Sequence, residues 1–146
     1  MERRTRMIAQ LLVATLLVLC TVTIHGVGLL YLARMLSEER EEEREANLSP
    51  LSIRGISTTL GVVLGLFALH GVEIWLYAIV YTALHALPDF QTAVYFSTVT
   101  YSTIGYDDEG LAVAWQMVAA VEGMKGVLLM GWSTAFFISL MGRLRR

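Results

Sequence analysis

Three apolar runs, each long enough to cross a lipid bilayer, constrain this chain more than any other feature. They cover residues 7–33, 56–84 and 111–141. A helix needs about 20 apolar residues to cross roughly 30 Å of hydrocarbon, where the backbone must satisfy its own hydrogen bonds. Charged residues make up only 16% of the 146 residues, against about a quarter in a soluble domain. The pattern predicts an all-α membrane protein with three transmembrane helices.

The first run follows an arginine-rich start and could be mistaken for a secretory signal. It continues to about residue 33, well beyond the roughly 7–15 residues of a signal-peptide core, and no small-residue cleavage site is evident. We interpret it as a retained transmembrane helix. The mixed-charge run at residues 37–45 is expected to extend this helix as a solvated linker. Ser49 and Pro50 then predict the start of the second helix, as N-cap and first-turn proline.

The stretch between the second and third runs, residues 88–110, is too short to span. Residues 89–100 are mostly apolar or aromatic, which suits a re-entrant half-helix with Asp89 as its N-cap. The segment after it is not helical in pattern. Non-helical backbone at membrane depth is tolerated only where protein buries it or water lines it. The order of span, half-helix, irregular segment and span is typical of a pore loop.

Residues 95–108 resemble the pore signature of potassium channels, an aromatic pair followed by T-x-x-T-x-G-Y-G-D. The matching residues are Thr100, Thr103, Gly105, Tyr106 and Asp108, while Ile104 replaces the usual Val and Asp107 the usual Gly. The resemblance covers residues 55–146, as an outer helix, pore helix, filter and inner helix. Residues 1–54 remain as an N-terminal transmembrane helix and charged cytoplasmic linker. The chain looks like small bacterial members of this family that carry an extra leading helix.

The resemblance implies a homotetramer that passes dehydrated K⁺ through a filter of backbone carbonyls. The implied filter is Thr103, Ile104, Gly105, Tyr106 and Asp107, with K⁺ bound at the first four. Its strand alternates between ordinary and left-handed backbone geometry, which Gly adopts without steric cost. Asp is among the few other residues that visit this region.

Asp107 leaves the selectivity open. Together with Asp108 and Glu109 it places an acidic ring at the outer mouth. A weakly selective or divalent-sensitive cation channel is therefore one alternative to a potassium-selective channel. A non-conducting membrane scaffold or modulatory subunit is another, although such a chain would be expected to lose Thr100, Thr103 and Gly105.

The third run has two distinct faces. One is a charge-free stripe at helical spacing, expected to line the ion cavity. The other is expected to pack on a neighbouring helix, because lysines from four subunits around the axis would repel the permeant ion. The first face comprises Met124, Val127, Gly131, Thr134 and Ile138, and the second Glu122, Lys125, Leu129, Ser133 and Phe136.

Glycines in the second and third runs predict close helix contacts or hinges. Gly61 and Gly65 form a G-x-x-x-G pattern, for which the first helix is the expected partner. Gly126 or Gly131 is either a gating hinge or a close-packing site.

Ionisable residues inside the runs predict a buried charge network, since such residues normally face protein and pair. At about 1.5 Å per residue, Glu73 and Lys125 lie at depths of roughly 16 and 20 Å. We predict that Glu73, Glu122 and Lys125 interact between the two helices, with His70 and Tyr77 one turn either side of Glu73. The alternative is that Lys125 pairs only with Glu122.

The three histidines, His25, His70 and His85, lie on different elements without paired ligand spacing. We therefore expect no cofactor and no metal other than permeant K⁺. The sequence has no Ser/His/Asp constellation and no phosphate-binding glycine loop, so an enzyme is not expected. The expected partners are other copies of the chain and the lipid bilayer, with no nucleic acid and no small-molecule substrate.

Arginines predict the orientation. Seven of them lie on the side of the linker and the C-terminus, which is therefore expected to be cytoplasmic, with the filter facing outside. The three near the N-terminus oppose this assignment. The expected location is the bacterial inner (cell) membrane, as a multi-pass protein.

Overall fold

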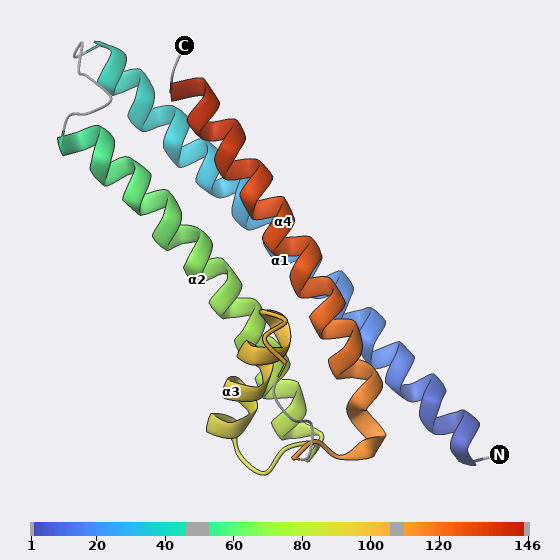
Figure 1. The fold of residues 1–146 in the computed structure, drawn as a ribbon. Coiled ribbons are helices and arrows are strands. Elements are labelled where there is room, and N and C mark those ends of the chain that lie inside the picture. Colours follow the sequence, from blue (N-terminus) through green and yellow to red (C-terminus); the bar gives the residue numbers. More distant parts are fainter. Residues whose placement is uncertain (1, 46–52, 106–109, 145–146) are drawn as a thin grey trace.

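Three long helices and one short helix make up the chain (Figure 1). The computed structural model describes residues 2–45, 53–105 and 110–144. Within these ranges all regular structure is helical, which confirms the predicted fold class. The elements are α1 (Glu2–Glu45), α2 (Ile53–Ala83), α3 (Phe90–Tyr101), a 3-10 turn η1 (Val113–Trp115) and α4 (Gln116–Leu144).

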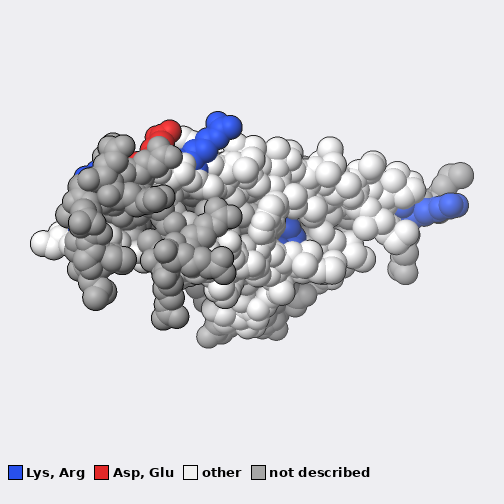
Figure 2. Space-filling view, turned by 90° about the horizontal axis from the view of Figure 1, so that it is seen from above, with Lys and Arg blue, Asp and Glu red and all other residues white. Residues whose placement is uncertain are grey.

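The long helices contain the predicted membrane spans. Segments long and apolar enough to cross a membrane run over Met7–Glu38, Ile53–Ala83 and Val113–Gly142. On the face in Figure 2, charged side chains are sparse among the described residues, and most of that surface is white. Large apolar side chains are exposed along all three helices, including Leu16, Trp75 and Leu128. A surface of this kind suits lipid or further copies of the chain.

α1 is a single helix that continues to Glu45, which confirms that the charged run extends it. The predicted helix start at Ser49 and Pro50 lies outside the described residues. One stripe of α1 packs against both α2 and α4. Its buried members recur at helical spacing and are Ala14, Leu17, Thr21, His25, Leu29 and Leu36.

α3 begins where the sequence predicts. The Asp89 carboxylate accepts hydrogen bonds from the Thr92 amide and the Thr92 hydroxyl, both at 2.8 Å, which confirms Asp89 as the N-cap. The backbone and then the side-chain hydrogen bond from Thr92 hold the pKa of Asp89 below its ordinary value. α3 packs against both α2 and α4, and in Figure 1 it lies beside the last turns of α2.

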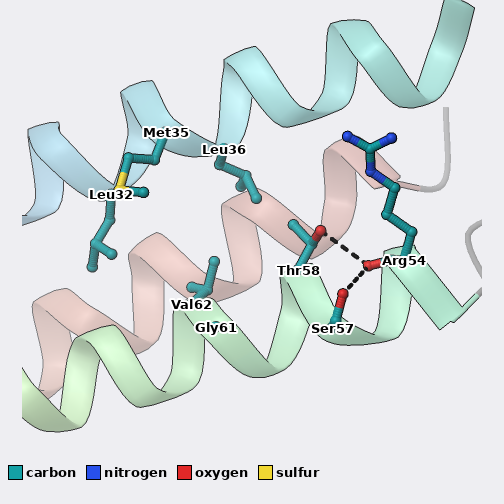
Figure 3. A pocket seen from close by; sticks show the side chains of 8 residues that line it. All are labelled: Leu32, Met35, Leu36, Arg54, Ser57, Thr58, Gly61 and Val62. Atoms are coloured by element: carbon teal, nitrogen blue, oxygen red, sulfur yellow. Dashed lines mark hydrogen bonds between the residues drawn. The ribbon is translucent and has the colours of Figure 1, made fainter.

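Two apolar clusters hold the helices together. The larger joins α1, α2, α3 and α4 around Tyr77, Tyr81 and Val118. The smaller joins α1, α2 and α4 through Leu36, Val62 and Leu140. Near the smaller cluster, a cavity of about 260 Å³ separates α1 from α2 (Figure 3). Its lining comprises Leu32, Met35, Leu36, Arg54, Ser57, Thr58, Gly61 and Val62.

Glycine contacts explain how closely α1 and α2 approach. A Cβ atom at Gly65 would lie 2.6 Å from a Leu32 methyl carbon, and one at Gly28 would lie 2.6 Å from a Leu69 methyl carbon. Gly61 has no atom within 4 Å of such a position and instead lines the cavity (Figure 3). The predicted contact between the G-x-x-x-G pattern and the first helix is therefore correct at Gly65 and wrong at Gly61.

Candidate functional site

The segment after α3 alternates in backbone conformation. Thr103 has φ +59° and Gly105 has φ +58°, whereas Ile104 between them has a negative φ. The Thr103 amide donates to the Thr100 carbonyl at 3.1 Å, and the Gly105 amide donates to the Val99 carbonyl at 3.2 Å. These bonds fold the segment back onto the last turn of α3. Left-handed geometry at alternate residues is what the resemblance implies for a filter strand.

The first three predicted filter residues are exposed on the single chain, with Ile104 67% accessible. The remaining predicted filter and mouth residues, Tyr106, Asp107, Asp108 and Glu109, lie outside the described residues. The described part of the segment thus lies on the surface of the single chain.

The two faces of α4 differ in burial along the helix. The stripe expected to line a cavity is exposed throughout, with Met124 63% and Ile138 65% accessible. On the opposite face Glu122, Lys125, Leu129 and Ser133 are buried and Phe136 is half-buried. In the single chain the charged face is covered by the other helices.

Gly126 brings α4 directly against the C-terminal end of α3. A Cβ atom there would lie 2.2 Å from the Tyr101 carbonyl oxygen, whereas one at Gly131 would meet nothing within 4 Å. Gly123 adds a contact, 3.3 Å from its Cβ position to the Thr100 oxygen. Of the two roles considered for Gly126, the geometry favours close packing.

Glu122 is fully buried and held by hydroxyl groups from two other helices. The Tyr81 hydroxyl donates to one carboxylate oxygen at 2.8 Å. The Ser97 hydroxyl contacts the other oxygen and also lies 3.1 Å from the Ile74 carbonyl oxygen. The Ser97 hydroxyl has one proton for these two acceptors. Glu122 thereby braces α4 against α2 and α3.

Lys125 does not form the ion pairs that the sequence predicts. Its buried ammonium nitrogen has no hydrogen-bond partner among the described residues. It lies 4.3 Å from the ring centroid of Tyr77 and 4.4 Å from that of Tyr101. Two aromatic faces attract a cation without an ionic contact. The prediction of direct pairing with Glu73 or Glu122 is therefore wrong for the described structure, although all three side chains are buried.

Glu73 is instead bound to a histidine of α1. One carboxylate oxygen lies 2.8 Å from His25 Nδ1, and the other accepts a 2.5 Å hydrogen bond from the Tyr101 hydroxyl. The Tyr101 oxygen is also 2.6 Å from His70 Nδ1. The Ser133 hydroxyl oxygen lies 3.1 Å from His70 Nε2 and 3.2 Å from His25 Nε2. Glu73, Tyr101, His70, Ser133 and His25 thus form a closed ring of contacts, which we call the five-residue ring.

The five-residue ring brings together two of the three histidines, which lie on different elements as the sequence predicts. His25 and His70 come from different helices, yet their ring centroids are 5.3 Å apart. His85 is exposed and lies apart from them, at the end of α2. The sequence carries one signal for His25: it falls on the stripe of α1 that recurs at helical spacing with Leu17, Thr21 and Leu36. The sequence did not reveal which helix that stripe meets.

Ligand atoms of His25, His70 and Glu73 lie within 4.8 Å of one another, so metal binding requires a test of fit. Neighbouring ligands of a tetrahedral zinc ion lie about 3.3 Å apart, given bonds of about 2.0 Å. His25 Nδ1 and the Glu73 oxygen are 2.8 Å apart, and each of the four imidazole nitrogens already has a hydrogen-bond partner. The arrangement therefore fits hydrogen bonds better than a metal ion.

Comparisons with known proteins identify a family for this chain. Neither the curated proteins nor the solved structures contain a match to the chain. A family model described as "Ion channel" matches residues 60–143, which include α3, all but the last residue of α4 and most of α2. Because this match covers more than half of the 146 residues, the chain belongs to the ion channel family.

Proposed function

We propose that this ion channel is a homotetramer selective for K⁺, with a filter formed by residues 103–107. The observation that carries the proposal is the pair of left-handed residues, Thr103 and Gly105, directly after a short helix between two spans. One such segment cannot surround an ion. Four copies around one axis would supply the ring of carbonyl oxygens that replaces the water shell of K⁺.

In this proposal, residues 55–146 form the pore domain and residues 1–54 an accessory helix and linker. The exposed stripe of α4 from Met124 to Ile138 lines the cavity below the filter. Its exposure in the single chain supports that role. The filter faces the outside of a bacterial inner membrane and the C-terminus faces the cytoplasm, on the strength of the arginine distribution.

Ion flux into liposomes tests the proposal. Purified protein should admit K⁺ faster than Na⁺, and barium should block the flux. The matched control is Gly105→Ala, because a Cβ atom at φ +58° is strained while nothing nearer than 4.0 Å would obstruct it. This variant should assemble and lose K⁺ flux. Equal flux through wild type and Gly105→Ala would contradict a filter at this segment.

Two alternatives to this proposal give different results in the same assay. Comparable K⁺ and Na⁺ flux, with K⁺ selectivity gained in Asp107→Gly, would indicate a weakly selective channel. No flux of either ion, together with a stable tetramer in detergent, would indicate a scaffold or modulatory subunit. A stable monomer in several mild detergents would contradict the tetramer itself.

A further inference from the structure

The five-residue ring is unusual because it closes on itself. Its contacts run from Glu73 to Tyr101, His70, Ser133, His25 and back to Glu73, with lengths of 2.5, 2.6, 3.1, 3.2 and 2.8 Å. The members come from α1, α2, α3 and α4. Four of them are almost fully buried, and the His70 side chain is 18% accessible. Among the ring members, His70 is therefore the one that reaches the surface of the single chain.

A closed ring imposes a proton count. Each contact of hydrogen-bond length must hold one proton, because two facing lone pairs repel and a buried polar atom without a partner is costly. Five contacts therefore need five protons. With Glu73 ionised, the hydroxyls of Tyr101 and Ser133 and two neutral imidazoles supply one proton each, which makes four. The ring is one proton short of completion.

Two arrangements accommodate the fifth proton. In the first, His25 or His70 is an imidazolium and donates from Nε2 to Ser133, whose hydroxyl donates to the other histidine. In the second, Glu73 is a carboxylic acid that donates to Tyr101, and Tyr101 donates in turn to His70. In both, all five contacts carry a proton, and the ring as a whole has no net charge.

We propose that the five-residue ring is a proton-binding site, complete only when it holds one proton beyond those of an ionised Glu73 and two neutral histidines. The bound proton joins α1, α2 and α4 to the last residue of α3. His70 is the member through which a proton would enter or leave the ring, because it reaches the surface of the single chain. This proposal does not depend on which ion the channel conducts.

Other titratable groups pack around the ring. α2 adds Tyr77, and α4 adds the Lys125 ammonium, which lies over the ring of Tyr101. Glu122 of α4 contacts the hydroxyls of Tyr81 and Ser97. α1 contributes no described charged group beyond His25 to this core. Among the described residues, none of these groups shares a hydrogen bond with a member of the ring, so the proton count of the ring is unchanged.

Loss of the proton should open the ring at Ser133. Its two contacts are the longest, at 3.1 and 3.2 Å, whereas the other three are 2.8 Å or shorter. The three short contacts need only the three protons of Tyr101 and two neutral histidines. Deprotonation therefore breaks the contact of Ser133 on α4 with His25 or His70, whereas Tyr101 keeps its hydrogen bonds to Glu73 and His70. Tyr101 precedes Thr103 by two residues, so the site connects α1 to the start of the predicted filter.

Nitrogen NMR of ¹⁵N-histidine in the full-length protein, purified in detergent, tests the proton count. The probe is the proton alone, supplied by a pH series. Infrared difference spectra between wild type and Glu73→Gln report whether Glu73 is a carboxylic acid. At neutral pH the wild type should hold one extra proton per chain, seen either as one imidazolium shared by His25 and His70 or as a protonated Glu73.

Two variants should lose the extra proton by different routes. In Glu73→Gln the amide offers one acceptor and one donor, so the ring is complete with two neutral histidines. In Ser133→Ala the ring is open, and its three remaining contacts need no extra proton. His85→Asn is the matched control, because His85 is exposed, lies outside the ring and has φ +52°, which Asn tolerates. It should remove one histidine signal and leave the other two unchanged.

The proposal is overturned if wild type at neutral pH has an ionised Glu73 with two neutral histidines. It is equally overturned if Glu73→Gln, folded as judged by its thermal unfolding midpoint, keeps an imidazolium at His25 or His70. Neither result would bear on the flux assay. Failure of this site and failure of the proposed channel function are thus separable.

Discussion

Glu73 on α2 and Glu122 on α4 are two fully buried carboxylates, yet their partners differ in kind and in origin. Glu122 is held by the hydroxyls of Tyr81 and Ser97, and all three residues lie within the family match at 60–143. Glu73 reaches outside that match to His25 on α1. The comparison indicates that Glu122 braces the channel domain internally, whereas Glu73 attaches the additional helix to it.

The comparison also distinguishes two ways of burying charge. Hydroxyl groups can donate to a carboxylate but do not accept an extra proton near neutral pH, whereas imidazoles do. The surroundings of Glu122 are therefore a fixed brace, and those of Glu73 can change protonation state. Lys125 lies against the aromatic faces of Tyr77 and Tyr101 and belongs to neither set of hydrogen bonds among the described residues.

The largest expected effect comes from reversing charges. Glu73→Lys would bury an ammonium beside His25, and Lys125→Glu would bury a third carboxylate between two tyrosine rings. Each should cost about 3–5 kcal/mol, the range for an uncompensated buried charge. The double variant should not recover, because Glu73 and Lys125 share no hydrogen bond. Thermal unfolding midpoints of the two single variants and the double variant measure this. If the double variant recovers the wild-type midpoint, Glu73 and Lys125 form the ion pair that the sequence predicts, and this account is wrong.

Gly126→Ala should disturb both carboxylates at once, since Gly126 sets the distance between α4 and α3. The new methyl group would meet the Tyr101 carbonyl oxygen, a backbone atom, at 2.2 Å. We expect a loss of about 3 kcal/mol from overpacking and a weaker tetramer in detergent. Gly131→Ala is the control, because its Cβ position is open. That variant should gain up to about 1 kcal/mol from helix propensity. Equal behaviour of the two variants would mean that α4 lies further from α3.

His25→Ala should weaken the attachment of α1 through Glu73 without disturbing the hydrogen bonds of Glu122. It leaves acceptors and donors of the five-residue ring unpaired, at about 1–3 kcal/mol, but it leaves the bonds of Glu122 untouched. Hydrogen exchange should increase in α1 near residue 25 and remain slow at Tyr81 and Ser97. Thr23→Ala is the control on α1, because Thr23 is exposed and its hydroxyl bonds only to the Leu19 carbonyl of its own helix. Faster exchange throughout α3 and α4 in His25→Ala would show that α1 supports the whole core.

The smallest expected effect is at Asp89, which is exposed and outside both carboxylate sites. Its pKa is held below the ordinary value by the Thr92 bonds. A lowered folded-state pKa means that the stabilising contribution is present above the unfolded-state pKa and is lost as pH falls through the folded one. The difference in unfolding midpoint between wild type and Asp89→Ala should therefore be small at neutral pH and vanish in acid. Asp89→Asn should keep a cap with no such pH dependence, and a difference that grows in acid would contradict this account.

Much of the fold follows from local sequence rules. Apolar runs of sufficient length had to be helices, because hydrocarbon offers the backbone no other partner. The Asp89 cap and the extension of α1 to Glu45 follow from local preferences and were confirmed. The pore-loop resemblance led to the correct family, since its residues are consecutive in the chain.

Tertiary structure alone decided which buried groups meet. Counting residues along the helices placed Glu73 and Lys125 at similar depths. Depth does not specify how each helix is rotated about its own axis, and that rotation decides which side chains face each other. The sequence left α1 without a role, whereas its packing against both α2 and α4 brings His25 to Glu73. Contacts between residues 48 and 108 positions apart depend on how four helices pack, which no local pattern encodes.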